Sequence, residues 1–259
     1  MTDTLVVSSV NAVLLLTLNR PERHNSLDAA LVSEIHKALE ETRDDAGIRV
    51  VVLQGEGESF CAGHDPEYLI SISPNPPMDH AGESLAFLRM LYELRAFPKP
   101  TIARVQGAAI SGGCCLALAC DIVVAAEEAR FGFPDVRFGF VPGAAVPLLV
   151  ERVGAASARE LLLRGNVVDA DTAMDLGMIN YVVGAGELDA SVEKLAFEIA
   201  EKTSPEAVRL TKRLYFDVLS MDFAGAMRHT AAFEALARTT ESHHAGLDAI
   251  REQRKPSWE

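Results

Sequence analysis

Hydrophobic and polar positions along the first fifty residues follow two different periods, and each period predicts a type of element. Residues 5–10 and 12–18 are rich in apolar and β-branched side chains, so they predict two short strands or a hairpin. Within residues 29–42 the apolar side chains recur at spacings of three and four, which predicts an amphipathic helix. The continuous apolar run at residues 50–53 is typical of a buried strand.

The middle of the chain alternates strand and helix patterns. Residues 71–78 contain three prolines and predict a surface loop, after which residues 82–95 predict a helix. Residues 101–105 predict a strand, and the small residues of segment 107–120 predict a turn with a short helix. Residues 121–125 predict another strand, so this part has the alternation of an α/β fold.

The last part of the chain has a helical pattern from about residue 188 onward. No repeat, low-complexity tract or linker marks a boundary before it. We therefore predict an α/β core over residues 1–187 and a helical C-terminal region over residues 188–259.

Composition and charge narrow the class of protein. The 259 residues are 49% hydrophobic and 24% charged, which is the composition of a globular protein with a sizeable core. The formal net charge is −13, and a chain so acidic repels the phosphate backbone that supplies most non-specific affinity for nucleic acid. We therefore expect no nucleic-acid partner.

The N-terminal residues, the longest apolar run and the cysteines bear on the location of the protein in the cell. The first residues show no basic stretch followed by an apolar stretch, and the longest run of apolar and small residues, 107–120, is too short to span a bilayer. We expect a cytoplasmic protein without a membrane partner. The cysteines at positions 61, 114, 115 and 120 are predicted to be reduced thiols, and their spacing does not suit a metal site.

Two familiar motifs are excluded by single residues. Segment 55–60 begins like a dinucleotide-binding fingerprint, but Phe60 replaces its third glycine. Ser111 does not stand in a Gly-x-Ser-x-Gly nucleophile elbow, because residue 109 is alanine.

Two glycine-rich turns remain, and each follows a predicted buried strand. They are residues 60–65 and residues 107–113. The backbone N–H groups of such turns are fixed donors that could converge on a developing oxyanion. The alternative is that the glycines serve only tight turns and close packing.

Four segments on and around these turns form a recognisable set, namely residues 18–27 (LNRPERHNSL), 60–65 (FCAGHD), 105–121 (VQGAAISGGCCLALACD) and 131–142 (FGFPDVRFGFVP). Together they resemble the enoyl-CoA hydratase/isomerase (crotonase) family. The resemblance covers nearly the whole chain. It implies a crotonase-like α/β fold, which is a spiral of ββα turns followed by a C-terminal helical trimerisation region. It also implies a homotrimer or a dimer of trimers.

By resemblance, the family's oxyanion hole falls on the backbone N–H groups of His64 and Gly112, which stabilise a thioester enolate. The neighbouring residues of the two turns are then expected to contact the substrate, namely Ala62, Gly63, Asp65 and Gly113. Since peptide groups supply the hole, the His64 imidazole is not required for it. Its side chain is expected to point either toward the acyl pocket or toward solvent.

The sequence departs from the family at the two glutamates that a family hydratase uses for acid–base work. Cys115 occupies the first position and Asp135 the second. A buried neutral thiol is a poor acceptor for a nucleophilic water, so this exchange disfavours hydration. It leaves open a one-base reaction in which Asp135 removes and returns a proton. As a covalent nucleophile, Cys115 has no neighbouring cation in the sequence to lower its pKa.

Coenzyme A is anionic, so an acidic protein must bind it with local cations. Arg20, Arg23 and His24 lie in the segment that resembles the family's adenine-binding loop. Lys212, Arg213 and Lys255 are further candidates in the helical part. The alternative for each of these cations is an ordinary solvated surface side chain.

The sequence thus predicts an acyl-CoA enzyme that hydrates or isomerises an enoyl-CoA, with the CoA thioester as substrate and no further cofactor or metal. Two alternatives are open. One is a CoA-thioester hydrolase on the same fold, and the other is a non-catalytic acyl-CoA-binding protein. Turnover of an enoyl-CoA distinguishes the last of these from the enzymes.

Overall fold

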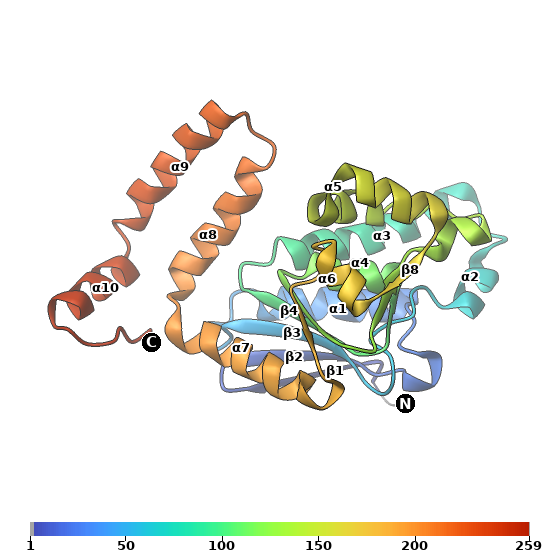
Figure 1. Ribbon diagram of the computed structural model, residues 1–259, viewed down its shortest axis with the longest axis horizontal. Helices are drawn as coiled ribbons and strands as arrows, with labels where there is room; N and C mark the ends of the chain where they lie inside the picture. Colours follow the sequence, from blue (N-terminus) through green and yellow to red (C-terminus); the bar gives the residue numbers. More distant parts are fainter. Residues whose placement is uncertain (1–2, 259) are drawn as a thin grey trace.

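The computed structural model describes residues 3–258 and has a mostly parallel sheet at its centre (Figure 1). In the part of the chain that it describes, this sheet has six strands in the order β1-β2-β3-β4-β6-β9. β1 and β2 form an antiparallel hairpin, and every further neighbour pairs in parallel. The bounds are β1 Leu5–Val10, β2 Val13–Leu18, β3 Val50–Gly55, β4 Thr101–Val105, β6 Ile122–Ala126 and β9 Tyr181–Val183.

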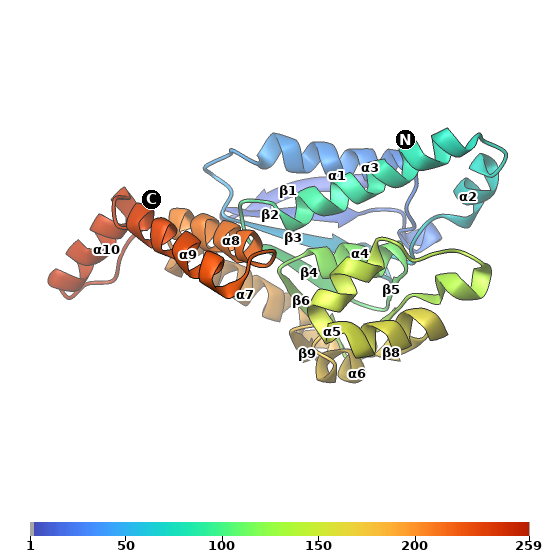
Figure 2. The ribbon, with the colours of Figure 1, turned by 90° about the horizontal axis from the view of Figure 1, so that it is seen from above.

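Helices cover both faces of this sheet (Figure 2). Side chains alternate along β3, so that Val51 and Leu53 face the core formed with α1, α3 and α4, whereas Val50 and Val52 face α7. All four are buried, which explains why this strand reads as a continuous apolar run. The helices are α1 Ala29–Thr42, α2 Pro66–Ile72, α3 Pro77–Arg95, α4 Gly112–Ala119, α5 Ala145–Arg164, α6 Ala170–Asp175, α7 Leu188–Lys202, α8 Pro205–Val218, α9 Phe223–Ala237 and α10 Glu241–Arg251.

A second, three-stranded sheet lies beside α4, and the sequence pattern did not predict its strands. Its order is β5-β7-β8, from Ala108–Ile110, Arg130–Gly132 and Val167–Asp169. Strands of three residues are too short to show a period, so only their pairing identifies them. The short helices η1 Pro21–Arg23, η2 Pro134–Phe138 and η3 Ala185–Glu187 complete the described elements.

The proline-rich segment differs from its prediction as a loop over residues 71–78. α2 extends to Ile72 and α3 begins at Pro77, so the connection is shorter and the second helix starts earlier than residue 82. Pro77 stands in the first turn of α3, where a proline fits because the N–H that it lacks would have no helical partner. The prolines therefore mark helix starts here and not a continuous loop.

The C-terminal helices separate into one that covers the sheet and three that leave it. α7 buries Leu188, Val192, Ala196 and Ala200 at four-residue spacing against β2, β3, β4 and β6. From Pro205 onward α8, α9 and α10 extend away from the sheet (Figures 1 and 2). α7, the first helix of the predicted C-terminal region, packs on the core. None of the helices within residues 3–258 combines the length and apolar character that crossing a membrane requires.

Candidate active site

The two glycine-rich turns lie side by side. The N–H of Cys61 donates to the carbonyl of Ala108 over 2.9 Å, and the N–H of Ile110 donates to the carbonyl of Cys61 over 3.0 Å. Cys61 thus forms a parallel bridge to Ala109 in β5, the strand that leads into α4. This pairing brings His64 and Gly112 together although they are distant in the sequence.

Glycines allow this approach. A Cβ built on Gly113 would lie 2.1 Å from the carbonyl oxygen of Cys61, closer than real atoms come. Gly63 has a φ of +96°, and a Cβ there would meet the carbonyl of Ile110 at 2.9 Å. Close packing, one of the two interpretations of these glycines, is therefore a physical requirement of the turns.

The same turns present two backbone donors. On either side of His64, the carbonyl of Gly63 and the N–H of Asp65 bond to Leu27, so the N–H of His64 points the opposite way. Gly112 is the first residue of α4, where a helical N–H has no partner within the helix. Within residues 3–258, neither N–H donates to a protein acceptor. An oxyanion hole requires two fixed N–H donors that lie close together in space and have no protein acceptor, as these two do.

Asp135 lies beside these donors. It belongs to η2, which directly follows β7, and β7 pairs with β5. Its carboxylate is half-buried, and Oδ2 accepts a hydrogen bond of 2.9 Å from the hydroxyl of Ser111. The structure therefore places this acid–base candidate next to the residue that precedes the Gly112 donor.

Cys115 lies in the first turn of α4, three residues after Gly112. Its side chain is only 3% exposed, and burial raises the pKa of the thiol well above its ordinary value, with the negative charge of Asp135 and the Cys114 thiol acting in the same direction. The thiol is consequently neutral. Cys61, Cys114 and Cys120 are likewise free and buried.

The His64 ring points inward. It packs edge-on against Phe87 of α3, with ring centroids 4.8 Å apart. A Cβ on Gly112 would lie 3.0 Å from its Cε1, so the ring also covers the Gly112 backbone. Burial lowers the pKa of His64, and the charge of Asp135 only partly opposes this. The ring is therefore a neutral wall of the site, and the sequence did not identify its partner Phe87.

Comparison with known proteins places the whole chain in one family. A model of the enoyl-CoA hydratase/isomerase family matches residues 8–259. The chain is 37% identical over 246 residues to a Thermus thermophilus protein named as an enoyl-CoA hydratase, covering 95% of this chain and 97% of the relative. It is 32% identical over 258 residues to the crotonyl-CoA hydratase of Syntrophomonas wolfei, covering 99% and 98%. The crystal structure of an enoyl-CoA hydratase from Bacillus anthracis superposes with a TM-score of 0.93 at 29% identity, covering 99% of both chains.

The chain belongs to the enoyl-CoA hydratase/isomerase family. It is an acyl-CoA enzyme of that family, and the crotonase-like fold predicted from the sequence is confirmed.

In this family member, Asp65 has a structural task that the sequence analysis did not foresee. Its Oδ2 accepts hydrogen bonds of 2.9 Å from both Arg20 and Arg23, and its Oδ1 accepts from the N–H groups of Glu67 and Tyr68 as the N-cap of α2. Burial would raise the pKa of Asp65, but these hydrogen bonds outweigh it and lower the pKa. Both oxygens are occupied, so the carboxylate orients the oxyanion turn and is not free to bind a ligand.

The predicted CoA-binding cations are only partly available. Arg20 is buried and pairs with Asp28 and Asp65, so it holds the loop together. Arg23 is half-exposed beside Glu67, and His24 is exposed at the end of η1. These two remain candidates for an anionic ligand.

Lys212 is a correction to the candidates from the helical part. Its side chain is 9% exposed, and its Nζ lies 2.6 Å from Asp121 and 3.1 Å from the carbonyl oxygen of Lys99. Burial lowers the pKa of Lys212, and the Asp121 carboxylate opposes this. This ammonium group therefore anchors α8 to the core through Asp121 and the Lys99 carbonyl.

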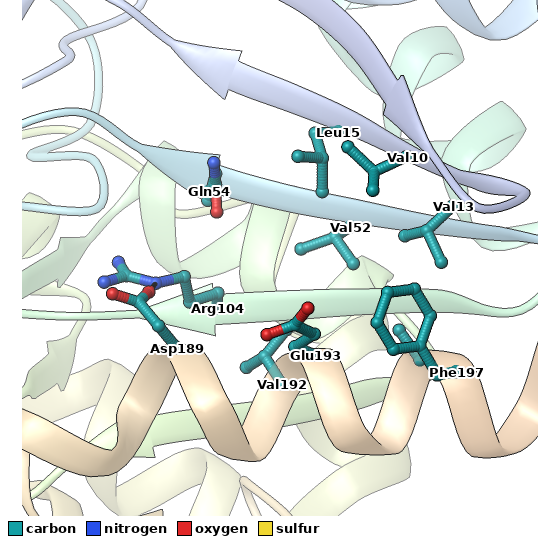
Figure 3. Close-up of a pocket in the computed structure, with 11 residues that line it drawn as sticks. Val10, Val13, Leu15, Val52, Gln54, Arg104, Asp189, Val192, Glu193 and Phe197 are labelled. Atoms are coloured by element: carbon teal, nitrogen blue, oxygen red, sulfur yellow. Dashed lines mark hydrogen bonds and ion pairs between the residues drawn. The ribbon is translucent and has the colours of Figure 1, made fainter.

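Two cavities lie apart from this site. One, of about 190 Å³, lies between the sheet and α7, where Val13, Val52 and Phe197 face each other and the Arg104–Asp189 ion pair closes one side (Figure 3). The other, of about 680 Å³, lies between α8 and the core and contains the Lys212–Asp121 pair. Neither is lined by His64, Gly112 or Asp135, so neither is part of the candidate active site.

Proposed function

We propose that this protein shifts a double bond in the acyl chain of an enoyl-CoA, with Asp135 as its acid–base group. The proposal rests on a half-buried carboxylate, Asp135, that is hydrogen-bonded to the residue before the free Gly112 N–H, together with a buried neutral thiol at Cys115. Hydration requires one group to deprotonate water and another to protonate the α-carbon, and a neutral thiol is a poor acceptor for water. A double-bond shift requires only one base.

In the proposed reaction, Asp135 takes a proton from the α-carbon of a 3-enoyl thioester, or from the γ-carbon of a 2-enoyl thioester. The electron pair of the broken C–H bond moves into the conjugated thioester, and negative charge gathers on its carbonyl oxygen. The N–H groups of His64 and Gly112 stabilise that charge, and one such donor is commonly worth about 2.7–4 kcal/mol in the transition state. Asp135 then returns the proton to the other carbon.

This reaction needs no redox step and no second substrate, so we propose the CoA thioester as the substrate and no further cofactor. Arg23 and His24, which are accessible at the loop before α1, are the proposed contacts for the anionic part of coenzyme A. Ala62, Gly63 and Gly113 are proposed to contact the thioester through their backbone, because they flank the two free donors.

We also propose a cytoplasmic homotrimer or dimer of trimers. The assembly is supported by α8, α9 and α10, which extend from the core and expose large apolar side chains. The location is supported by four buried free thiols.

The test is a panel of enoyl-CoA isomers incubated in D₂O and, separately, in H₂¹⁸O, with the products analysed by mass spectrometry. We expect deuterium at the α- or γ-carbon without addition of ¹⁸O. Incorporation of ¹⁸O into a hydroxyl group would favour hydration, and release of free acid would favour a thioester hydrolase. Binding without any conversion would identify a non-catalytic acyl-CoA-binding protein.

Two substitutions test the assignment of the base. Asp135→Asn should reduce deuterium exchange by about 10²- to 10⁴-fold, the usual contribution of a general acid–base group, with little change in CoA affinity. Cys115→Ala is the matched control and should retain most activity, because a neutral thiol transfers no proton. Full activity in Asp135→Asn with loss in Cys115→Ala would instead make the cysteine the catalytic residue.

A further inference from the structure

Ser111 has a backbone conformation that few residues other than glycine adopt. It stands between β5 and α4 with φ 49° and ψ −117°. Gly63 and Gly107, which also have a positive φ, are glycines, whereas His24 and Asn25 in the loop before α1 are not. A side chain at this position is unfavourable unless something compensates for it.

The compensation lies in the contacts of Ser111. Its N–H donates to the carbonyl of Gly132 in β7 over 2.8 Å, and its hydroxyl donates to Oδ2 of Asp135 over 2.9 Å. Ser111 therefore binds both ends of the short segment 132–135, once through its backbone and once through its side chain. The next residue along the chain is Gly112, whose N–H is one of the two free donors.

The hydrogen bond from Ser111 also distinguishes the two oxygens of the carboxylate. Oδ2 of Asp135 accepts the Ser111 hydroxyl, whereas Oδ1 has no hydrogen-bond donor among residues 3–258. An oxygen that accepts no hydrogen bond is more basic than one that already accepts one, so Oδ1 is the oxygen better suited to take a proton from a substrate carbon. The bond to an ionised carboxylate is charge-assisted, so it holds the side chain more firmly than a neutral hydrogen bond would.

We propose that Ser111 is the positioning residue of this enzyme: it fixes the Asp135 carboxylate at a set place relative to the Gly112 donor and leaves Oδ1 as the base. The inference rests on the proposed role of Asp135. This positioning role explains why a serine occupies a strained position. The side chain of Asp135 is one methylene shorter than that of glutamate, and the Ser111 hydroxyl immobilises its carboxylate.

Two variants separate the hydroxyl from the backbone. Ser111→Ala and Ser111→Gly both remove the hydroxyl, but alanine keeps a Cβ at positive φ and glycine relieves that strain. We expect kcat for deuterium exchange to fall about ten- to a hundredfold in both, since a misplacement of about 1 Å can cost about 10²-fold. KM should stay close to that of the wild type. Thermal unfolding should show Ser111→Gly at least as stable as Ser111→Ala.

A double-mutant cycle tests whether Ser111 acts through Asp135. Adding Ser111→Ala to Asp135→Asn should cause no further loss of kcat, because the group that the hydroxyl positions is already disabled. A merely structural role would reduce the residual activity again by the same factor. That multiplicative result would overturn the proposal.

Four further outcomes would also overturn it, each in a different way. Normal kcat in Ser111→Gly with a loss only in Ser111→Ala would assign the effect to the backbone. A covalent acyl adduct on Ser111, found by mass spectrometry of the wild-type enzyme quenched during turnover, would make Ser111 a nucleophile. A fully active Asp135→Asn would refute both the proposed function and the role of Ser111. An inactive Asp135→Asn together with fully active Ser111 variants would refute only the role of Ser111 and leave the proposed function intact.

Discussion

At the scale of single residues, His64 contributes two separate groups to the site. Its peptide N–H is one of the free donors, and its ring packs against Phe87 and over Gly112. A substitution that keeps the peptide and removes the ring therefore tests each contribution by itself.

We expect His64→Ala to retain most of its turnover, because alanine keeps the backbone N–H. It should lose about 0.5–1.5 kcal/mol of stability at neutral pH, the usual value of an aromatic ring contact. Urea denaturation and steady-state kinetics of the same preparations measure both effects. A loss of kcat of several hundredfold with intact folding would show that the imidazole takes part in the chemistry.

The His64 ring should also give stability a dependence on pH. Burial lowers its pKa in the folded protein below the ordinary value of 6.5, so the unfolded chain binds the proton more readily. The contribution of the neutral ring is thus complete above pH 6.5 and is lost as the pH falls through the folded-state pKa. Denaturation at about pH 7.5 and about pH 5.5 should show a smaller decrease in stability for His64→Ala than for the wild type. An equal decrease in both would assign the titration to another group.

At the scale of elements, the site depends on how closely α4 approaches segment 60–64. All eight residues of α4 are buried, and Gly113 leaves no room for a Cβ beside Cys61. The helix itself would tolerate alanine well, so only the neighbouring strand requires glycine here.

We therefore expect Gly113→Ala to destabilise the protein by about 1–3 kcal/mol, the usual cost of overpacking a core, and to reduce activity by displacing the oxyanion turn. Gly82→Ala is the matched control, since Gly82 lies in α3 with no atom within 4 Å of its added Cβ. The control should gain roughly 0.5–1 kcal/mol from helix propensity. Equal stability of the two variants in urea would refute the packing argument.

At the scale of the whole molecule, the protruding helices form a surface that a single chain does not cover. Phe223 and Ile250 are 82% and 74% exposed, and Met227, Leu236 and Leu247 are each at least half-exposed. Side chains of this size are normally buried in an assembled protein.

If these helices mediate assembly, the double substitution Phe223→Glu with Ile250→Glu should shift the protein from a trimer or hexamer toward a monomer in sedimentation velocity at micromolar concentration. Buried carboxylates in an apolar interface are strongly unfavourable. Lys37→Glu, on the exposed side of α1, is a control for added negative charge and should leave the assembly unchanged. A monomeric wild type would contradict the proposed assembly.

The sequence by itself determined the larger elements, the two glycine-rich turns and the family. Local patterns suffice for these, because a buried strand such as β3 and an amphipathic helix such as α1 show their burial in the residues themselves. The positions of Asp135 and Cys115 followed from the motifs around them. The proline-rich segment was misread where a proline begins a helix, because a local pattern does not distinguish the start of α3 from a loop.

Only the tertiary structure decided which polar groups meet. Ser111 and Asp135 are 24 residues apart in the chain and Arg20 and Asp65 are 45 apart, and pairing of short strands and loops brings each pair into contact. The same is true of Lys212 and Asp121, which join α8 to the core across 91 residues. The sequence does not distinguish a charged or hydroxyl side chain that is solvated from one that is paired. Its hydrogen-bond partner is determined by the fold and not by its neighbours in the chain.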